Sequence, residues 1–119
     1  MPFTQDKRAN QTVITTDATP TTIATIPIPT NGAVHFRVRV EGDEPIARDV
    51  HARVHEGVIK RIGSGAAVLV QTASILTWRD AGAATWGSTA TASGNNLVIT
   101  VTGQVGKTIN WRVIEETFA

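Results

Sequence analysis

The last third of the chain alternates apolar and polar residues with a period of two. Its apolar members stand at every second position: Leu97, Ile99 and Val101, then Ile109, Trp111 and Val113. A helix repeats every 3.6 residues and would spread these side chains around its circumference, whereas a strand places them on one face. The stretch therefore predicts two strands joined by a glycine-flanked turn, which we expect to pair as a closing hairpin.

The turn between these strands contains Gly103-Gln104-Val105-Gly106-Lys107-Thr108, which partly matches a phosphate-binding loop. That loop requires G-x-x-x-x-G-K-[ST] followed by a helix, so that backbone N–H groups surround a phosphate. Here Val101 stands where the first glycine is needed, and the residues after Thr108 alternate like a strand. We interpret the run as a tight turn, in which glycine supplies a positive φ and Lys107 is solvated.

Composition limits the classes of protein that this chain can represent. At 119 residues it is expected to form one domain, and the absence of cysteine excludes disulfides and thiolate metal sites. The net charge of +1 argues against a nucleic-acid partner, which usually requires a marked basic excess. No apolar run approaches the roughly 20 residues that span a bilayer, and the N-terminus lacks an apolar signal core, so no membrane partner is expected.

Turn signals divide most of the chain into short strands. Residues 1–11 lack any period and are expected to form an extended N-terminal arm, with residues 12–119 as the folded domain. Glu56-Gly57 is interpreted as a short turn, and residues 66–78 as one bent strand or two. About eight strands and no convincing amphipathic helix predict an all-β, antiparallel β-sandwich that is jelly-roll-like.

Two alternating segments carry the main charged feature of the sequence. Residues 34–41 place valine and phenylalanine opposite charged side chains, and residues 49–55 do the same. If the two segments pair with their apolar faces toward the core, their polar faces combine into one surface. We expect this surface to contact another subunit or partner, because guanidinium groups can fork to carboxylates. Its members are His35, Arg37, Arg39, Asp49, His51, Arg53 and His55.

The three histidines raise the question of a metal site. His51 and His55 are four residues apart on an expected strand, which separates them by roughly 13 Å, so they cannot share one ion. His35 could approach one of them across the paired strands, with Asp49 or Glu41 as a third ligand. A solvated polar face explains the same residues, and we expect no metal and no other cofactor.

No arrangement of residues predicts catalysis. None of the serines lies in a nucleophile-elbow context, and cysteine is absent. Glu115 and Glu116 are adjacent on an expected strand and so point to opposite faces. The three tryptophans, Trp78, Trp86 and Trp111, are interpreted as core residues rather than as a ligand platform. We therefore expect a protein that is not an enzyme.

Two stretches resemble a β-sandwich domain of structural proteins in tailed bacteriophages, often found at the C-terminal end of tail-fibre-like chains. They are Thr15-Thr16-Asp17-Ala18-Thr19-Pro20-Thr21-Thr22-Ile23, and the run from Gly94 to Gly103 together with Gly106 to Trp111. The resemblance covers roughly residues 12–116. It implies the fold and a virion context, and it transfers no catalytic or binding residue.

The length of the chain suggests which virion role to expect. A fibre needs a long shaft, whereas this chain starts at Met1 with a short arm and is expected to be complete. The hypothesis is therefore a capsid decoration (cement) protein, made in the host cytoplasm, that forms a homotrimer on the major capsid protein or another virion protein. The arm would dock through Pro2, Phe3, Lys7 and Arg8. The alternative is a tail-fibre or receptor-binding tip that contacts the host through residues 42–45 and 79–83.

Overall fold

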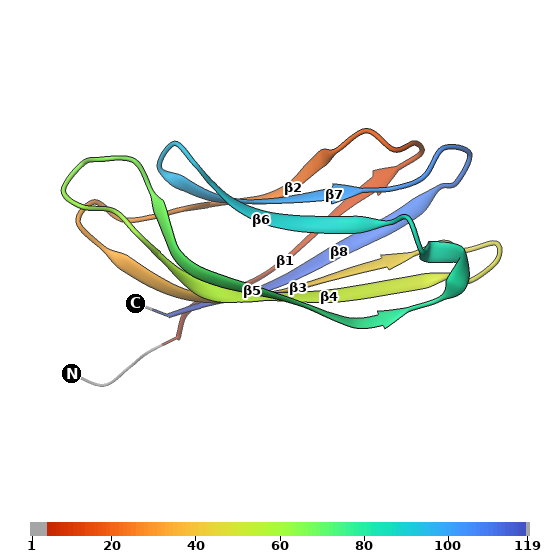
Figure 1. Cartoon of the computed structure of the whole chain (residues 1–119), viewed down its shortest axis with the longest axis horizontal. Coiled ribbons are helices and arrows are strands. Elements are labelled where there is room, and N and C mark those ends of the chain that lie inside the picture. Colours follow the sequence, from red (N-terminus) through yellow and green to blue (C-terminus); the bar gives the residue numbers. More distant parts are fainter. Residues whose placement is uncertain (1–4, 119) are drawn as a thin grey trace.

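The protein is an antiparallel β-sandwich, as the alternation predicts (Figure 1). The computed structural model describes residues 5–118, with side chains described for residues 11–117. Within this range the elements are β1 (Gln5–Thr15), β2 (Thr21–Pro27), β3 (Ala33–Asp43), β4 (Val50–Lys60), β5 (Val68–Arg79), the 3-10 helix η1 (Ala81–Ala83), β6 (Gly87–Ser93), β7 (Asn96–Thr102) and β8 (Ile109–Phe118). No helix in this range is long and apolar enough to cross a membrane.

The strands form two sheets that lie one above the other in Figure 1. The larger sheet has the order β1-β8-β3-β4-β5, and the smaller has the order β2-β7-β6. The first strand pairs with the last and the second with the second-to-last, which is the jelly-roll element of the connectivity. In contrast, β3, β4 and β5 follow one another as a meander.

The expected closing hairpin is wrong, because β7 and β8 belong to different sheets. The segment between them crosses from the smaller sheet to the larger at one end of the sandwich. There Gly103 lies against the Thr15 hydroxyl and the Asp17 carbonyl, and a Cβ on residue 103 would overlap both. Strands β6 and β7, in contrast, form a tight hairpin, joined at Gly94, whose φ is +56°.

The expected turn at Glu56-Gly57 is also wrong, because β4 continues through it. Gly57 pairs with Phe36 on one side and with Thr72 on the other, so both ladders of hydrogen bonds pass this point unbroken. Glycine is needed here for close approach, since a Cβ on residue 57 would overlap the carbonyl oxygen of Gln71 in β5. Glycine in this strand therefore marks contact between backbones and not a turn.

The N-terminal segment begins its strand earlier than the alternation suggests. The expected first strand starts at Thr12, whereas β1 starts at Gln5 and pairs with β8 along its length. Backbone pairing with β8 does not require apolar alternation, which is why the polar residues 5–11 gave no strand signal. Of the four residues named for docking, Pro2 and Phe3 lie outside the described residues. Lys7 and Arg8 lie in β1.

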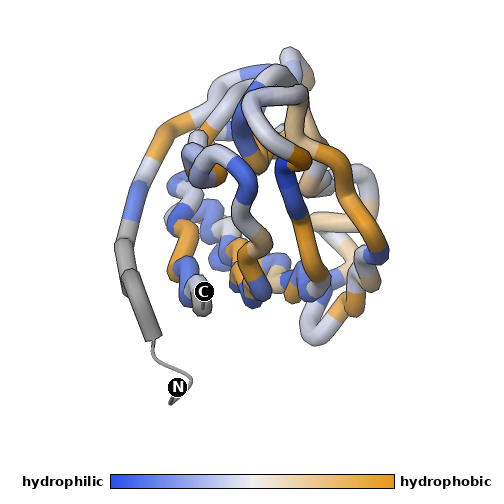
Figure 2. Tube along the Cα trace, turned by 90° about the vertical axis from the view of Figure 1, so that its left-hand side faces the viewer, coloured by the Kyte–Doolittle hydropathy of each residue, from blue (hydrophilic) through white to orange (hydrophobic). Residues whose placement is uncertain are grey.

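The core fills the space between the sheets. Strands β3, β7 and β8 supply alternate side chains to it, and Figure 2, a view along the length of the sandwich, shows hydrophobic and hydrophilic positions alternating along the strands. At the centre Trp111 is buried, and its indole N–H donates to the Thr15 hydroxyl at 2.9 Å. Trp86 meets the same ring edge-on, with ring centroids 6.0 Å apart. The core placement predicted for these two tryptophans is confirmed.

The two glycines at positions 57 and 87 provide a matched test of this packing. We expect Gly57→Ala to lower the free energy of unfolding by about 2 kcal/mol or more, because the new methyl group must displace the β5 backbone. Gly87→Ala, in β6, meets no atom within 4 Å and should change stability by less than ~0.5 kcal/mol. Urea unfolding measures both. Equal stability of the two variants would contradict the β4–β5 pairing.

Candidate interaction surfaces

The pairing register divides the expected polar surface between the two faces of the larger sheet. Opposite residues on paired strands share a face, and Val38 lies opposite His55, and Val40 opposite Arg53. His51, Arg53 and His55 therefore face the smaller sheet, together with the core valines. The prediction of a single polar surface is wrong for these three residues, because it assumed that Val50, Ala52 and Val54 face the core.

The outer face of the larger sheet holds the remaining charged residues. His35, Arg37 and Arg39 are exposed there on β3. The face carries a ladder of ion pairs: Arg37 with Glu56 at 3.1 Å, Arg39 with Glu41 at 2.8 Å, Arg48 with Asp43 at 3.2 Å, and Arg112 with Glu41. Exposed pairs of this kind contribute only about 0–1 kcal/mol each to stability. Their main effect is to cancel charge across the face.

On the inner face, His55 joins the two sheets through its ring nitrogens. Nδ1 hydrogen-bonds to the Ser74 hydroxyl in β5 at 2.7 Å, and Nε2 to the Ser88 hydroxyl in β6 at 2.8 Å. A neutral imidazole donates with one nitrogen and accepts with the other, so both hydroxyls can be satisfied. Burial lowers the pKa of His55 to about 4, and the positive charge of Arg53 adds to this effect.

His51 lies on the same face of β4 as His55, four residues earlier in the chain. It is only 1% exposed, and its ring meets Trp111 edge-on at a centroid distance of 6.1 Å. Neither ring nitrogen has a hydrogen-bond partner among the described residues. Burial lowers the pKa of His51 to about 4, and the positive charges of Arg53 and Arg79 contribute smaller effects in the same direction. Both inner histidines are therefore neutral at pH 7 and act as core residues.

The edge strand β5 exposes a run of apolar side chains. Its neighbour in the sheet is β4 on one side, and no described strand pairs with its other side. Five of its apolar residues are between 38% and 62% exposed: Val68, Val70, Ile75, Leu76 and Trp78. No residue from 68 to 78 is charged. Natural edge strands usually carry charges that block pairing with another chain, so this strand is open to a partner.

Sequence reasoning missed the β5 edge. Trp78 was expected in the core, but it is 62% exposed, and this prediction is wrong. Residues 66–78 were expected to form one bent strand or two. All but the first two of them lie in the single strand β5, which has an irregular register against β4 near Thr77 and Val70. The lack of charge in this run was the available signal, but the position of the strand at an edge depends on the topology.

The β3–β4, β5–β6 and β7–β8 loops contact one another at the end of the sandwich that lies on the right in Figure 1. Asp80, just before η1, accepts a hydrogen bond from the Val50 N–H at 3.0 Å. Lys107, from the loop between β7 and β8, forms an ion pair with Asp49 at 3.2 Å, so it is not the solvated turn residue that we expected. We call this end the tip. Ile46 and Val105 there are 93% and 74% exposed.

The described side chains contain no cluster of three or more histidine, cysteine, aspartate or glutamate residues arranged to hold a metal ion. Neither a protein-family model nor the sequence of a curated protein matches the chain. Among solved structures, it is similar to the tailspike protein gp49 of Acinetobacter baumannii bacteriophage Fri1, a capsular polysaccharide depolymerase, with a TM-score of 0.43 and 12% identity. That alignment covers 98% of this chain but only 19% of the tailspike. A likeness of this degree assigns neither a family nor a function.

The buried histidines predict a loss of stability in mild acid. The pKa of each is about 4 in the folded protein against an ordinary 6.5, so the unfolded chain takes up protons first as the pH falls. The free energy of unfolding should therefore decrease between pH 6.5 and pH 4, by up to about 1.4 kcal/mol per pH unit for each histidine.

Urea unfolding at a series of pH values measures this slope. His55→Gln should make the slope of stability against pH shallower between pH 6.5 and pH 4, because it removes one of the two histidines whose pKa is lowered in the folded protein. Ile62→Gln, at an exposed loop residue that does not titrate, serves as the control and should keep the slope of the unmodified protein. A stability that is constant from pH 6.5 to 4 would contradict the burial of both rings.

Proposed function

We propose that the chain is a structural protein of a bacteriophage virion, which decorates the capsid as a homotrimer and stabilises the head. The observation that carries self-assembly is the β5 edge. Its unpaired N–H and C=O groups and exposed apolar side chains gain from burial against another chain. A subunit that binds only the assembled shell stabilises that shell by mass action.

The virion context rests on the two stretches that resemble phage structural domains, and these stretches pack together in the fold. Thr21, in the first stretch, pairs with Val101 in the second. Thr15 accepts the hydrogen bond from Trp111 and also lies against Gly103. The shared residues thus form one packing unit of the sandwich, which supports a relationship through architecture. The homotrimer is inferred from the same resemblance to phage structural domains. The proposed partner is the major capsid protein or another virion protein.

A receptor-binding or tail-fibre tip is the second candidate, and the tip favours it. The loop of residues 44–49 is held in place by Glu44, whose carboxylate accepts from the Ile46 and Ala47 N–H groups at 2.8 and 2.7 Å. This loop presents Ile46 beside the loops that contain Asp80 and Val105. Together these loops form a compact surface on which Ile46 and Val105 are exposed, which suits contact with a host molecule.

Location on the virion separates the two candidates. Gold-labelled antibody against the chain should decorate the heads of purified particles. Label confined to the tail would overturn the decoration role and favour the receptor-binding tip. Absence of the chain from purified particles would overturn both.

Self-assembly has its own test in a variant of the β5 edge. Light scattering should give a trimer mass for the unmodified protein and a smaller mass for Val70→Lys. Val70 has no opposite residue in β4, so the new charge blocks the edge without disturbing β4–β5 pairing. Ile62→Lys makes the same kind of change at an exposed loop residue and should leave the mass unchanged. A monomer at high concentration would contradict the proposal.

A further inference from the structure

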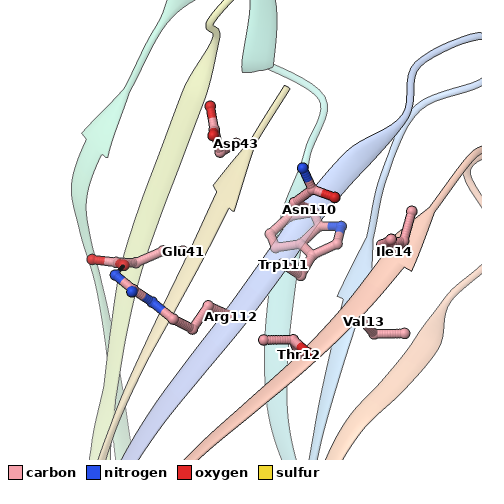
Figure 3. Close-up of a pocket in the computed structure, with 8 residues that line it drawn as sticks. All are labelled: Thr12, Val13, Ile14, Glu41, Asp43, Asn110, Trp111 and Arg112. Atoms are coloured by element: carbon pink, nitrogen blue, oxygen red, sulfur yellow. Dashed lines mark hydrogen bonds and ion pairs between the residues drawn. The ribbon is translucent and has the colours of Figure 1, made fainter. Parts of the chain in front are cut away.

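A groove crosses the outer face of the larger sheet close to the tip. It consists of two hollows of about 460 and 320 Å³, which share Glu41 and Asp43 in their lining. The first hollow extends over β8 and β1, where Asn110, Arg112 and Ile14 line it (Figure 3). The second extends over β4 and β5, where it ends at Trp78. Together the hollows reach from one edge of the sheet to the other.

The strand register shows why the groove has this course. One row of residues crosses all five strands, and each of its members lies opposite the next on the neighbouring strand. In order from β5 to β1, the row is Trp78, Ala52, Glu41, Arg112 and Thr12. Neighbouring strands are about 4.8 Å apart, so the row spans roughly 19 Å. Ala52 is the small residue between the indole of Trp78 and the carboxylate of Glu41, and it leaves room for a ligand between them.

The lining combines the exposed indole of Trp78 with polar groups of opposite charge. Trp78 is 62% exposed at one end of the groove, and Ile14 is 63% exposed at the other. Between them, Glu41 accepts from both Arg39 and Arg112, while Asp43 pairs with Arg48. The charged residues in the lining itself are two carboxylates, Glu41 and Asp43, and two guanidinium groups, Arg39 and Arg112. Because these four charges balance, the groove has little net attraction for a polyanion or a polycation. It still offers many hydrogen-bond donors and acceptors.

The backbone beneath the groove excludes strand addition as the mode of binding. β4, β3 and β8 are internal strands, and their N–H and C=O groups already bond to neighbours on both sides. A ligand that crosses them must therefore bind through side chains, which differs from an extended peptide that pairs with a sheet edge. Hydroxyl groups can bridge a carboxylate and a guanidinium, and the C–H face of a sugar ring can stack on an indole.

We propose that this groove binds a linear, uncharged oligosaccharide, with one sugar ring stacked on Trp78 and neighbouring hydroxyls bonded to Glu41, Asp43 and Asn110. The row is long enough for several sugar units. The site is distinct from the loops of the tip, and Trp78 is the residue that it shares with the exposed apolar run of β5. It does not depend on the role of the protein in the virion.

A glycan array followed by NMR titration tests the proposal. The array should show binding to neutral chains of several units, and a neutral hexasaccharide from it should shift the Trp78 indole and Asn110 side-chain signals with saturation. Trp78→Ala and Asn110→Ala should each weaken binding about tenfold. Ile62→Ala, at an exposed loop residue, should bind normally. Because Asn110 is on β8, Asn110→Ala should also keep the oligomeric mass, which separates this test from that of self-assembly.

Three outcomes would overturn the proposal. The first is an array with no neutral glycan bound. The second is binding to charged glycans alone, since the paired charges of the groove predict the opposite. The third is a shift of the same signals by an uncharged peptide of serine, threonine and glutamine but by no glycan, which would assign the groove to a protein partner.

Discussion

The packing of Trp111 is the contact on which the arrangement of the larger sheet depends. Its ring lies so close to Gly42 in β3 that a Cβ there would be 2.9 Å from it, and its N–H donates to Thr15 in β1. The same ring meets Trp86, which precedes β6, and His51 in β4. One side chain of β8 thus contacts residues from three other strands of its sheet, β1, β3 and β4, and from the segment that leads into the other sheet. Any shift of register at β3 or β8 would place a larger side chain against this ring.

Period-two alternation predicted the fold class and most strands, because each strand buries one face and exposes the other. It failed where both faces of a strand are partly covered. In β4, Ala52 and Val54 are buried on the outer face while His51 and His55 are buried on the inner face, so the apolar residues did not mark the core side. The register of β4 is set by residues 44–49, where the Glu44 N–H donates to the Asp49 carbonyl and Arg48 has a φ of +61°. The conformation of this loop accompanies the register that places both histidines on the inner face, and the alternation of β4 alone does not indicate it.

The candidate surfaces were harder to predict than the fold, since they depend on which strands lie at the edges. The uncharged run in β5 is visible in the sequence, but burial in the centre of a sheet would explain it equally well. Only the order of the strands shows that β5 has a neighbour on one side and that Trp78 is exposed. Likewise, Glu41 and Asn110 are far apart in the chain, and strand pairing brings them into one groove. The outer face and the β5 edge are thus consequences of topology that residue patterns alone do not contain.

We propose that a second chain covers the open edge of β5. Amide hydrogen exchange followed by NMR over a range of protein concentrations tests it most directly. In dilute protein, the β5 amides that do not bond to β4 should exchange rapidly, because solvent is their only partner. At concentrations where the oligomer forms, the same amides should become protected while those of β1 change little. Protection of β5 that does not depend on concentration, or oligomers in which these amides still exchange rapidly, would contradict the account.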